Sequence, residues 1–316
     1  MASSGFPDPA LFSAKSVTPE VQAFVDRLQQ QTLSRPPLGS PPPEGAPAAP
    51  PAFARPPKSP RARVIAVDAG GGRKVELRIV APDNPRGAYL AIHGGGLVMG
   101  SADQDDAMLE RIADSTGLAA VSVEYRLAPQ HPYPAAWDDC EAAAVWLANN
   151  VEAEFGGSVL AIGGESAGAT LAVPTLVRMR DKHGFTGFSA ANLSYGNYDS
   201  TMTPSQSLIG QHGYFLRTAD IQQCADLYAP DASLRRDPDM SALYADLHDL
   251  PAALFSVGTM DPFLDDSLFL YARWIAAGNQ AELEVYPGGT HGFNLMGHPL
   301  AGQVNARIDA FLKANT

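Results

Sequence analysis

From residue 63 onward, short apolar runs alternate with longer stretches in which apolar residues recur every three or four positions. Short runs rich in Val, Ile and Ala predict buried strands, and the longer stretches predict amphipathic helices. We expect strands at 88–93, 119–124, 159–163, 189–195, 252–258 and 281–286, and helices near 103–116, 135–154, 167–182, 262–277 and 302–313. This alternation predicts an α/β fold with a mostly parallel central sheet flanked by helices.

Two further runs, 63–69 and 74–82, flank the three consecutive glycines Gly70, Gly71 and Gly72. Apolar and polar residues alternate in both runs, and glycine readily forms the turn between two strands. We therefore expect a strand pair ahead of the alternating part of the chain.

The N-terminal region has a different pattern. Apolar residues recur on one face of a helix predicted over 19–31, namely Val21, Phe24, Val25 and Leu28. Eleven prolines follow between residues 36 and 60, a density that excludes a regular helix or a central strand. We expect a short helix that docks on the rest of the protein, then an extended connector anchored by Phe53. A disordered tail is the alternative.

The interval 199–249 interrupts the alternation of strands and helices. It contains turn residues at Thr203-Pro204 and Asp237-Pro238 and no convincing core strand. A long insertion after a strand is usually functional. In an open α/β sheet this one would lie over the carboxyl ends of the strands, where such sheets bind ligands.

The segment Gly164-Glu165-Ser166-Ala167-Gly168 matches G-x-S-x-G. It follows a predicted strand and precedes a predicted helix, which is the context of a nucleophile elbow. Glycines permit a tight turn that exposes the serine hydroxyl at the positive end of the helix. A chance match is the alternative in a chain with 29 glycines. The flanking strand and helix favour Ser166 as a nucleophile.

The segment His93-Gly94-Gly95-Gly96 follows the predicted strand 88–93. Consecutive glycines leave backbone N–H groups free to point at a developing oxyanion. Without the serine motif this run would indicate only a flexible turn. Together with that motif it predicts Gly94 and Gly95 as oxyanion donors, with the N–H of Ala167 as the third.

A serine nucleophile needs a base and an orienting carboxylate, and in this fold they follow it in the order acid, then histidine. Asp261 comes just after the predicted strand 252–258, and His291 comes just after 281–286. We predict these two residues as acid and base. Asp265 and Asp266 are weaker candidates, because they fall on a predicted helix.

Other histidines fit less well. His298 is the sequence neighbour of His291, but it precedes Pro299 beyond the loop, so we expect it at the surface. We expect His93 to have a structural role or a role in the oxyanion loop.

Composition narrows the possible functions. The 316 residues are 45% hydrophobic and 18% charged, with a net charge of −12. A negative surface repels phosphates, so we expect no nucleic-acid or membrane partner. No signal peptide or membrane-spanning run is evident. Cys140 and Cys224 predict buried free thiols in a reducing, cytoplasmic location. No motif indicates a metal or a cofactor.

Six separated motifs resemble those of the hormone-sensitive-lipase-like esterases, a bacterial family of the α/β-hydrolase superfamily. The resemblance extends from about Tyr89 to the C-terminus. The motifs are HGGG at 93–96, YRLAP at 125–129, YPAAWDD at 133–139, GESAG at 164–168, DPFLDD at 261–266 and HGF at 291–293.

The resemblance implies an α/β-hydrolase core with a mainly helical cap. The predicted division is 1–62 for the N-terminal part of the cap and the connector, and 199–249 for the cap insertion. Residues 63–198 and 250–316 then form the two parts of the catalytic core. Relatives often carry an aromatic residue where this chain has Leu97 and an acidic residue where it has Gln130. Pro174 should kink the helix after the serine.

These observations predict a carboxylesterase that hydrolyses short- to medium-chain esters through Ser166, His291 and Asp261 without a cofactor. The alternatives are an amidase or lactonase with the same residues, or a small-molecule-binding protein on a hydrolase scaffold. Relatives often dimerise through the last sheet edge, so a homodimer is a further expectation.

Overall fold

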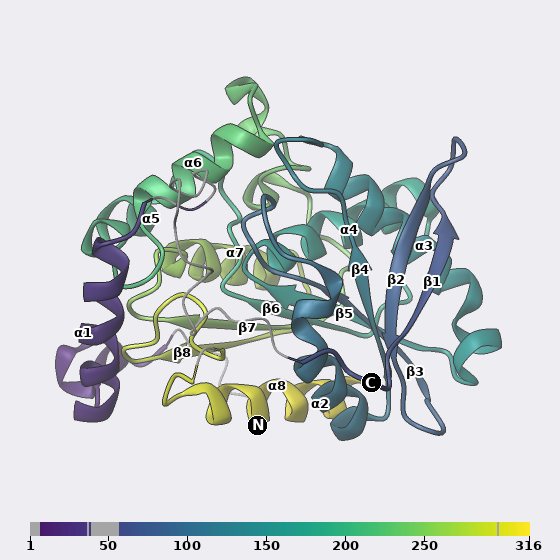
Figure 1. The fold of residues 1–316 in the computed structure, drawn as a ribbon, viewed down its shortest axis with the longest axis horizontal. Coiled ribbons are helices and arrows are strands. Elements are labelled where there is room, and N and C mark those ends of the chain that lie inside the picture. Colours follow the sequence, from purple (N-terminus) through teal and green to yellow (C-terminus); the bar gives the residue numbers. More distant parts are fainter. Residues whose placement is uncertain (1–6, 37, 39–56, 296) are drawn as a thin grey trace.

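The computed structural model of the chain describes residues 7–36, 38, 57–295 and 297–316. Phe53 and most of the proline-rich connector lie outside these described residues. Within them, the core is one eight-stranded sheet in the order β1-β2-β4-β3-β5-β6-β7-β8 (Figure 1). The strands are β1 (Arg63–Asp68), β2 (Lys74–Val80), β3 (Gly87–Ile92), β4 (Ala119–Glu124), β5 (Val159–Glu165), β6 (Ala190–Ser194), β7 (Ala252–Gly258) and β8 (Ala281–Tyr286).

Strand direction divides the sheet in two. β1 and β2 pair antiparallel, and β2 pairs antiparallel with β4. From β4 to β8 every neighbouring pair is parallel. The predictions of a mostly parallel sheet and of a strand pair at 63–69 and 74–82 are therefore confirmed, and the structure places that pair at one edge of the sheet.

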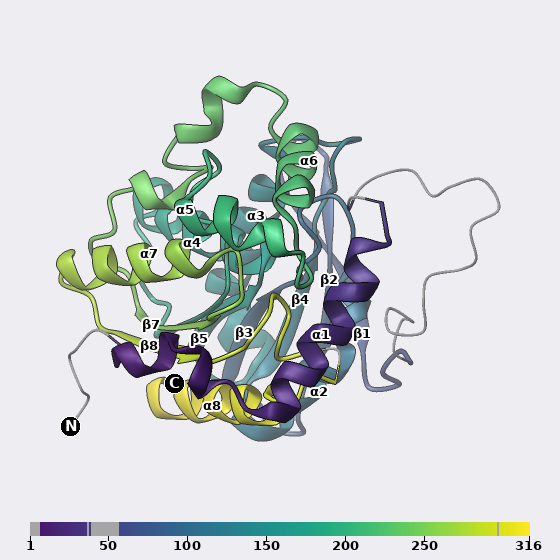
Figure 2. The same ribbon diagram turned by 90° about the vertical axis from the view of Figure 1, so that its left-hand side faces the viewer.

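Helices cover both faces of the sheet (Figures 1 and 2). One layer contains α2 (Asp106–Thr116) and α8 (Ala301–Asn315), which contact each other. The other contains α3 (Ala135–Phe155), α4 (Ala167–His183) and α7 (Leu264–Ala276).

The pleat of β3 explains why its sequence is a continuous apolar run. Leu90 and Ile92 belong to the core under α3, α4 and α7, whereas Tyr89 and Ala91 belong to the core under α2 and α8. Successive side chains of a strand point to opposite faces, so a strand covered on both sides is apolar throughout.

The observed boundaries differ from the predicted ones mainly at the helix starts. The helix expected from 103 begins with a 3-10 turn, Ala102–Asp105, and becomes α-helical at Asp106. The helix expected from 262 begins at Leu264, because Asp261 forms the turn that precedes it: its carboxylate accepts from the N–H of Phe263, and its carbonyl accepts from the N–H of Leu264. α4 continues through Pro174 to His183, and the kink expected there stays a prediction.

The N-terminal helix α1 (Pro19–Leu33) starts where Thr18 accepts a hydrogen bond from the backbone N–H of Val21 at 3.3 Å. Its first position is Pro19, whose fixed φ and missing N–H suit the start of a helix. Val21 and Val25 are buried, so the predicted apolar face does pack against the protein.

Residues 199–249 contain helices and loops and no strand. The α-helices here are α5 (Pro204–Leu208) and α6 (Thr218–Tyr228), accompanied by three short 3-10 helices, Gly210–His212, Ala232–Arg236 and Ala242–Tyr244. In Figure 2, α1 and α6 lie on the same side of the molecule. Across the described part of the chain, no helix is long and apolar enough to cross a membrane.

Arg35, just after α1, connects this helix to the insertion. Its guanidinium binds the buried carboxylate of Asp220 at 3.1 Å and the carbonyl of Phe215 at 2.7 Å. Burial would raise the pKa of Asp220, but hydrogen bonds from Arg217, the N–H of Leu38 and Arg35 outweigh it and lower that pKa.

Candidate active site

The turn between β5 and α4 holds Ser166 in an unusual backbone conformation. Its φ is 55° and its ψ is −120°, a region that non-glycine residues rarely adopt. The flanking glycines have a different role. A Cβ on Gly164 or Gly168 would collide with the carbonyl oxygen of Ile92 in β3. The motif therefore needs glycine because two strands and a helix meet here.

The structure brings Ser166, His291 and Asp261 together. Nε2 of His291 lies 2.7 Å from the Oγ of Ser166, and Nδ1 lies 3.2 and 3.1 Å from the two carboxylate oxygens of Asp261. Because a carboxylate only accepts hydrogen bonds, Nδ1 is the protonated nitrogen and Nε2 can accept the serine proton. Asp261 is fully buried and His291 nearly so.

Backbone hydrogen bonds fix the two loops that carry the acid and the histidine. The N–H of Met260 donates to the carbonyl of Gly289 at 2.9 Å, and the N–H of Thr259 donates to that of Tyr286 at 3.0 Å. Gly258 approaches Gly289 so closely that a Cβ would collide with it. The position of Asp261 relative to His291 is therefore set by the ends of β7 and β8.

Asp265 and Asp266 both lie on α7, as expected, and neither hydrogen-bonds to His291. Asp265 accepts a hydrogen bond from the N–H of Ser205 at 2.8 Å. Asp266 is fully buried, and burial raises its pKa to about 7. Its oxygens accept hydrogen bonds from four residues of the segment after β6, Tyr198, Asp199, Thr203 and Gln206.

The surface location expected for His298 is wrong, since only 3% of this residue is exposed. Its ring meets the ring of Phe24 in α1 edge to face, with centroids 4.7 Å apart, and the ring of Phe293 lies at 6.3 Å. Burial lowers the pKa of His298 to about 4. Its partner is 274 positions away in the chain, so local sequence gave no sign of this contact.

Aromatic rings surround His291 and were not anticipated from the sequence. Tyr195 and Phe263 contact its ring at centroid distances of 4.9 and 5.2 Å, and Phe215 stacks at 6.4 Å. Phe263 directly follows the DP pair of the acid loop, which could have suggested it. Nothing in the sequence places Phe215, which belongs to the insertion.

A buried polar chain lies behind these rings. The hydroxyl of Tyr195 donates to Asn294, whose amide donates to Glu165 at 3.3 Å. Burial raises the pKa of Glu165, although the charge of Arg111 opposes that effect. Glu165 is the residue before the serine, so this chain connects the serine turn to the loop that carries His291.

Of the predicted oxyanion donors, Gly94 lies beside the serine and Ala167 directly follows it in the chain. A Cβ on Gly94 would be 3.7 Å from the Cβ of Ser166, and Gly95 has a φ of 124°, which favours glycine. No described residue accepts a hydrogen bond from the backbone N–H of Gly94, Gly95 or Ala167. The N–H of Ala167 also lies at the positive end of α4.

His93 holds the loop that carries these glycines. Nδ1 of its ring donates to the carbonyl of Gly94 at 2.8 Å, and the ring stacks on Tyr125 at 4.0 Å. The hydroxyl of Tyr125 donates to the carbonyl of His93 at 2.9 Å. Burial lowers the pKa of His93 to about 4, so the ring is neutral at neutral pH. The structural role expected for it agrees with these contacts.

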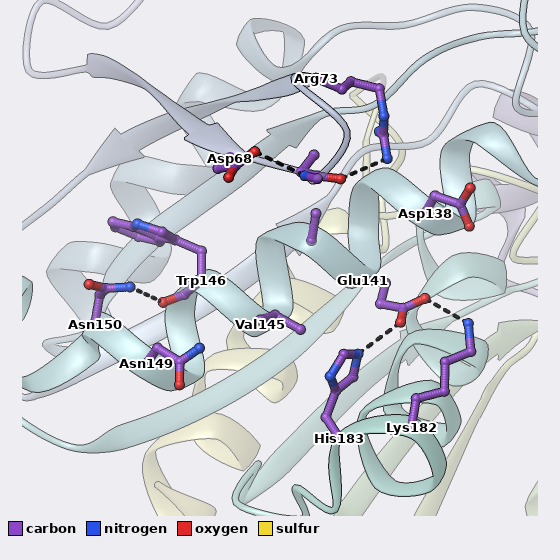
Figure 3. Close-up of a pocket in the computed structure, with 13 residues that line it drawn as sticks. Asp68, Arg73, Asp138, Glu141, Val145, Trp146, Asn149, Asn150, Lys182 and His183 are labelled. Atoms are coloured by element: carbon purple, nitrogen blue, oxygen red, sulfur yellow. Dashed lines mark hydrogen bonds and ion pairs between the residues drawn. The ribbon is translucent and has the colours of Figure 1, made fainter.

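A surface cavity of about 580 Å³ lies away from Ser166, between the β1–β2 turn, α3 and the end of α4 (Figure 3). It reaches Lys182 and His183, about 16 residues and therefore roughly 24 Å along α4 from Ser166. Glu141 binds both of these side chains, at 3.0 and 2.8 Å. This cavity has no part in chemistry at Ser166.

A serine on a strand-to-helix turn, a histidine and a carboxylate on later strand ends, and a parallel sheet between helix layers define an α/β hydrolase. A family model described as alpha/beta hydrolase fold matches residues 89–295. The chain belongs to the hormone-sensitive-lipase-like family of α/β hydrolases.

Two relatives indicate how far sequence similarity extends. Carboxylic ester hydrolase LipN of Mycobacterium tuberculosis is 34% identical, over 64% of this chain and 55% of LipN. This chain thus spans about half the length of LipN. An acetyl esterase of Salmonella schwarzengrund is 31% identical over 69% of each chain.

Solved structures match nearly the whole chain. An ester-hydrolase from the metagenome of Lake Arreo is 28% identical over 94% of this chain and 98% of its own, with a TM-score of 0.80. An esterase of Pyrobaculum calidifontis is 26% identical, with 97% and 98% covered and a TM-score of 0.75.

Proposed function

We propose that this protein is a carboxylesterase that hydrolyses short- to medium-chain esters through an acyl-enzyme on Ser166. The observation that carries the proposal is the 2.7 Å separation between the Oγ of Ser166 and Nε2 of His291. The esterase names of the relatives and structural neighbours support the same reaction class.

In the first step, the Oγ of Ser166 attacks the ester carbonyl while Nε2 of His291 takes the hydroxyl proton. The tetrahedral intermediate then expels the alcohol, which receives that proton from His291. Water attacks the acyl-enzyme in the same way, and the carboxylic acid leaves. Asp261 holds the imidazole in the required tautomer and stabilises its positive charge. His291 gives back each proton that it takes, so the cycle needs no cofactor.

The negative oxygen of each intermediate needs donors that are already in place. We assign this role to the N–H groups of Gly94, Gly95 and Ala167. Such donors need no reorganisation during the reaction, and removing one typically costs about 10²- to 10³-fold in rate.

We also propose that α1 and residues 199–249 form a cap over the site. Phe215 of the insertion stacks on His291, and a Cβ on Gly96 would lie only 2.9 Å from the Sγ of Cys224 in α6. The insertion thus contacts both the base and the oxyanion loop.

A cytoplasmic location is proposed as well, supported by the free thiols of Cys140 and Cys224.

A series of p-nitrophenyl esters tests the substrate class. We expect kcat/KM to peak at acyl chains of a few carbons and to fall sharply by palmitate, and the net charge of −12 disfavours binding to anionic lipid interfaces. A matched anilide should be cleaved far more slowly. Strong activation by emulsified triolein would contradict the chain-length preference, and faster anilide cleavage would favour an amidase.

A further inference from the structure

A second cavity, of about 280 Å³, lies between the loop after β6 and helix α6. The loop contributes Asn197 and Met202 to its lining, α6 contributes Ile221 and Ala225, and Arg235 follows α6 in the chain. The volume suits a group of several heavy atoms.

The cavity adjoins the reacting groups on two sides. On one side, the N–H of Asn197 donates to Thr170 Oγ1 at 2.9 Å, and that hydroxyl donates to the carbonyl of Ser166 at 3.1 Å. On the other, Ile221 packs in one apolar cluster with Phe263, whose ring lies 5.2 Å from that of His291. These contacts place the cavity next to the serine turn on one side and next to the ring that touches His291 on the other.

The polar groups around the cavity have unused hydrogen-bond donors. Nη1 of Arg235 has no acceptor among the described residues, and neither has its Nε–H, which is shielded from solvent. The amide oxygen of Asn197 accepts a long bond from Gln206 at 3.4 Å, but no described residue accepts from its NH₂ group. Unused donors on facing walls suit an acceptor-rich ligand.

Charge narrows the ligand class further. Nη2 of the Arg235 guanidinium binds Asp226 at 2.6 Å, but 60% of the Asp226 side chain is exposed. Water therefore screens this ion pair, whereas only 17% of the Arg235 side chain is exposed. A ligand carboxylate in the cavity would meet a mostly buried cation with an unused N–H.

We propose that this cavity binds a carboxylate carried by one arm of the ester substrate, so that the enzyme prefers acidic esters over neutral ones of equal length. The inference rests on the proposed esterase function and specifies its substrate class. Arg235 supplies the charge, and Asn197 supplies a donor from the facing wall.

Matched esters test the proposal and identify the arm. On the acyl side, mono-p-nitrophenyl adipate is compared with p-nitrophenyl hexanoate. On the alcohol side, 4-butyryloxybenzoate is compared with phenyl butyrate. The ratio of kcat/KM, acidic over neutral, is measured in the wild type, Arg235→Gln and Arg236→Gln. Arg236 is the matched control, because it has the same charge but does not line the cavity.

In one of the two pairs, we expect Arg235→Gln to lower the acidic-to-neutral ratio roughly tenfold or more, the usual effect of losing a charge-assisted hydrogen bond. Arg236→Gln should keep the wild-type ratio. If Arg235→Gln does not fold, Asn197→Leu tests the facing wall and should also lower the ratio. Equal ratios in all variants for both pairs overturn the proposal.

Binding of free adipate, followed by calorimetry, gives a readout that does not depend on turnover. We expect Arg235→Gln to weaken it roughly tenfold relative to Arg236→Gln. If the neutral esters are cleaved but neither readout depends on Arg235, only the cavity assignment fails. If no ester is cleaved while adipate binds through Arg235, the esterase proposal fails and the cavity remains.

Discussion

Three carboxylates that lie close together in the chain, Asp261, Asp265 and Asp266, have different surroundings. Asp261 faces the ring of His291, Asp265 caps the N–H of Ser205, and Asp266 is surrounded by donors from the segment after β6. The sequence predicts which of them meets the histidine, because Asp261 alone precedes the helix. It does not predict that Asp266 anchors the insertion, since its partners lie 60 or more positions away.

Replacing Asp261 with Asn should lower kcat about 10⁴-fold, because an amide can hold the imidazole in the wrong tautomer. Steady-state hydrolysis of p-nitrophenyl butyrate measures this. Asp265→Asn is the matched control and should stay within about tenfold of the wild type, because Asp265 only caps a backbone N–H. A larger loss in Asp265→Asn than in Asp261→Asn would reverse the assignment.

The two cysteine thiols should be unreactive in the folded protein. Burial, with a smaller contribution from the charge of Asp139, raises the pKa of Cys140 well above its usual value. Burial likewise raises the pKa of Cys224 to about 12. Because the thiolate is the reactive form, Ellman's reagent at pH 8 should react slowly until the protein is unfolded. Fast labelling of Cys224 in the native state would mean that α6 moves away from the oxyanion loop and exposes this thiol.

At the scale of elements, the sequence predicts what depends on local pattern. Every expected strand of the sheet is present. A strand buried on both faces, such as β3, is a continuous apolar run, whereas β1 and β2 alternate apolar and polar residues. Contacts between distant elements follow from no local pattern. The burial of His298 against Phe24 and the stacking of Phe215 on His291 are of this kind.

Helix α1 should contribute to both stability and substrate binding. Deleting residues 1–35 removes the Arg35 guanidinium from the buried Asp220 and uncovers His298. We expect a lower Tm and a higher KM, while kcat persists because Ser166, His291 and Asp261 stay in place. Unchanged Tm and kcat/KM would show that the segment is a tail, and the proposed N-terminal part of the cap would be withdrawn.

A point substitution tests the same docking with less disturbance. Val25 is fully buried on the inner face of α1, and its neighbour Asp26 is exposed. Val25→Ala should lower the free energy of unfolding by about 2 kcal/mol through lost burial and the remaining cavity. Asp26→Ala should change it by less than about 0.5 kcal/mol. Urea denaturation measures both, and equal effects would contradict docking of this face.

For the whole molecule, buried histidines make stability depend on pH. Burial lowers the pKa of His298 from 6.5 to about 4. Between these values the unfolded chain binds a proton that the folded chain does not, so this histidine lowers the free energy of unfolding as the pH falls. Above pH 6.5 it has no such effect.

His298→Leu isolates this contribution, because the other titrating groups are common to both proteins. The stability of the variant relative to the wild type should rise by up to about 1.4 kcal/mol per pH unit from pH 6.5 to 4. It should be constant between pH 7 and 8. A difference that is independent of pH throughout would contradict a buried, neutral His298.

Two expectations for the whole molecule stay predictions. A homodimer through the edge strand β8 is one, and light scattering of the purified protein would test it. On this strand, Glu284 binds Arg307 of the same chain at 2.8 Å, so that side chain is already paired. The cytoplasmic location is the other.

The central claim is that Ser166 is the nucleophile, and covalent labelling tests it most directly. A fluorophosphonate probe should add one phosphonyl group per chain, located by peptide mass spectrometry on Ser166. Ser166→Ala should take up no probe, keep the wild-type fold by circular dichroism and lose about 10⁶-fold in ester turnover. Labelling at another residue, or more than about one percent of wild-type turnover in Ser166→Ala, would contradict the mechanism.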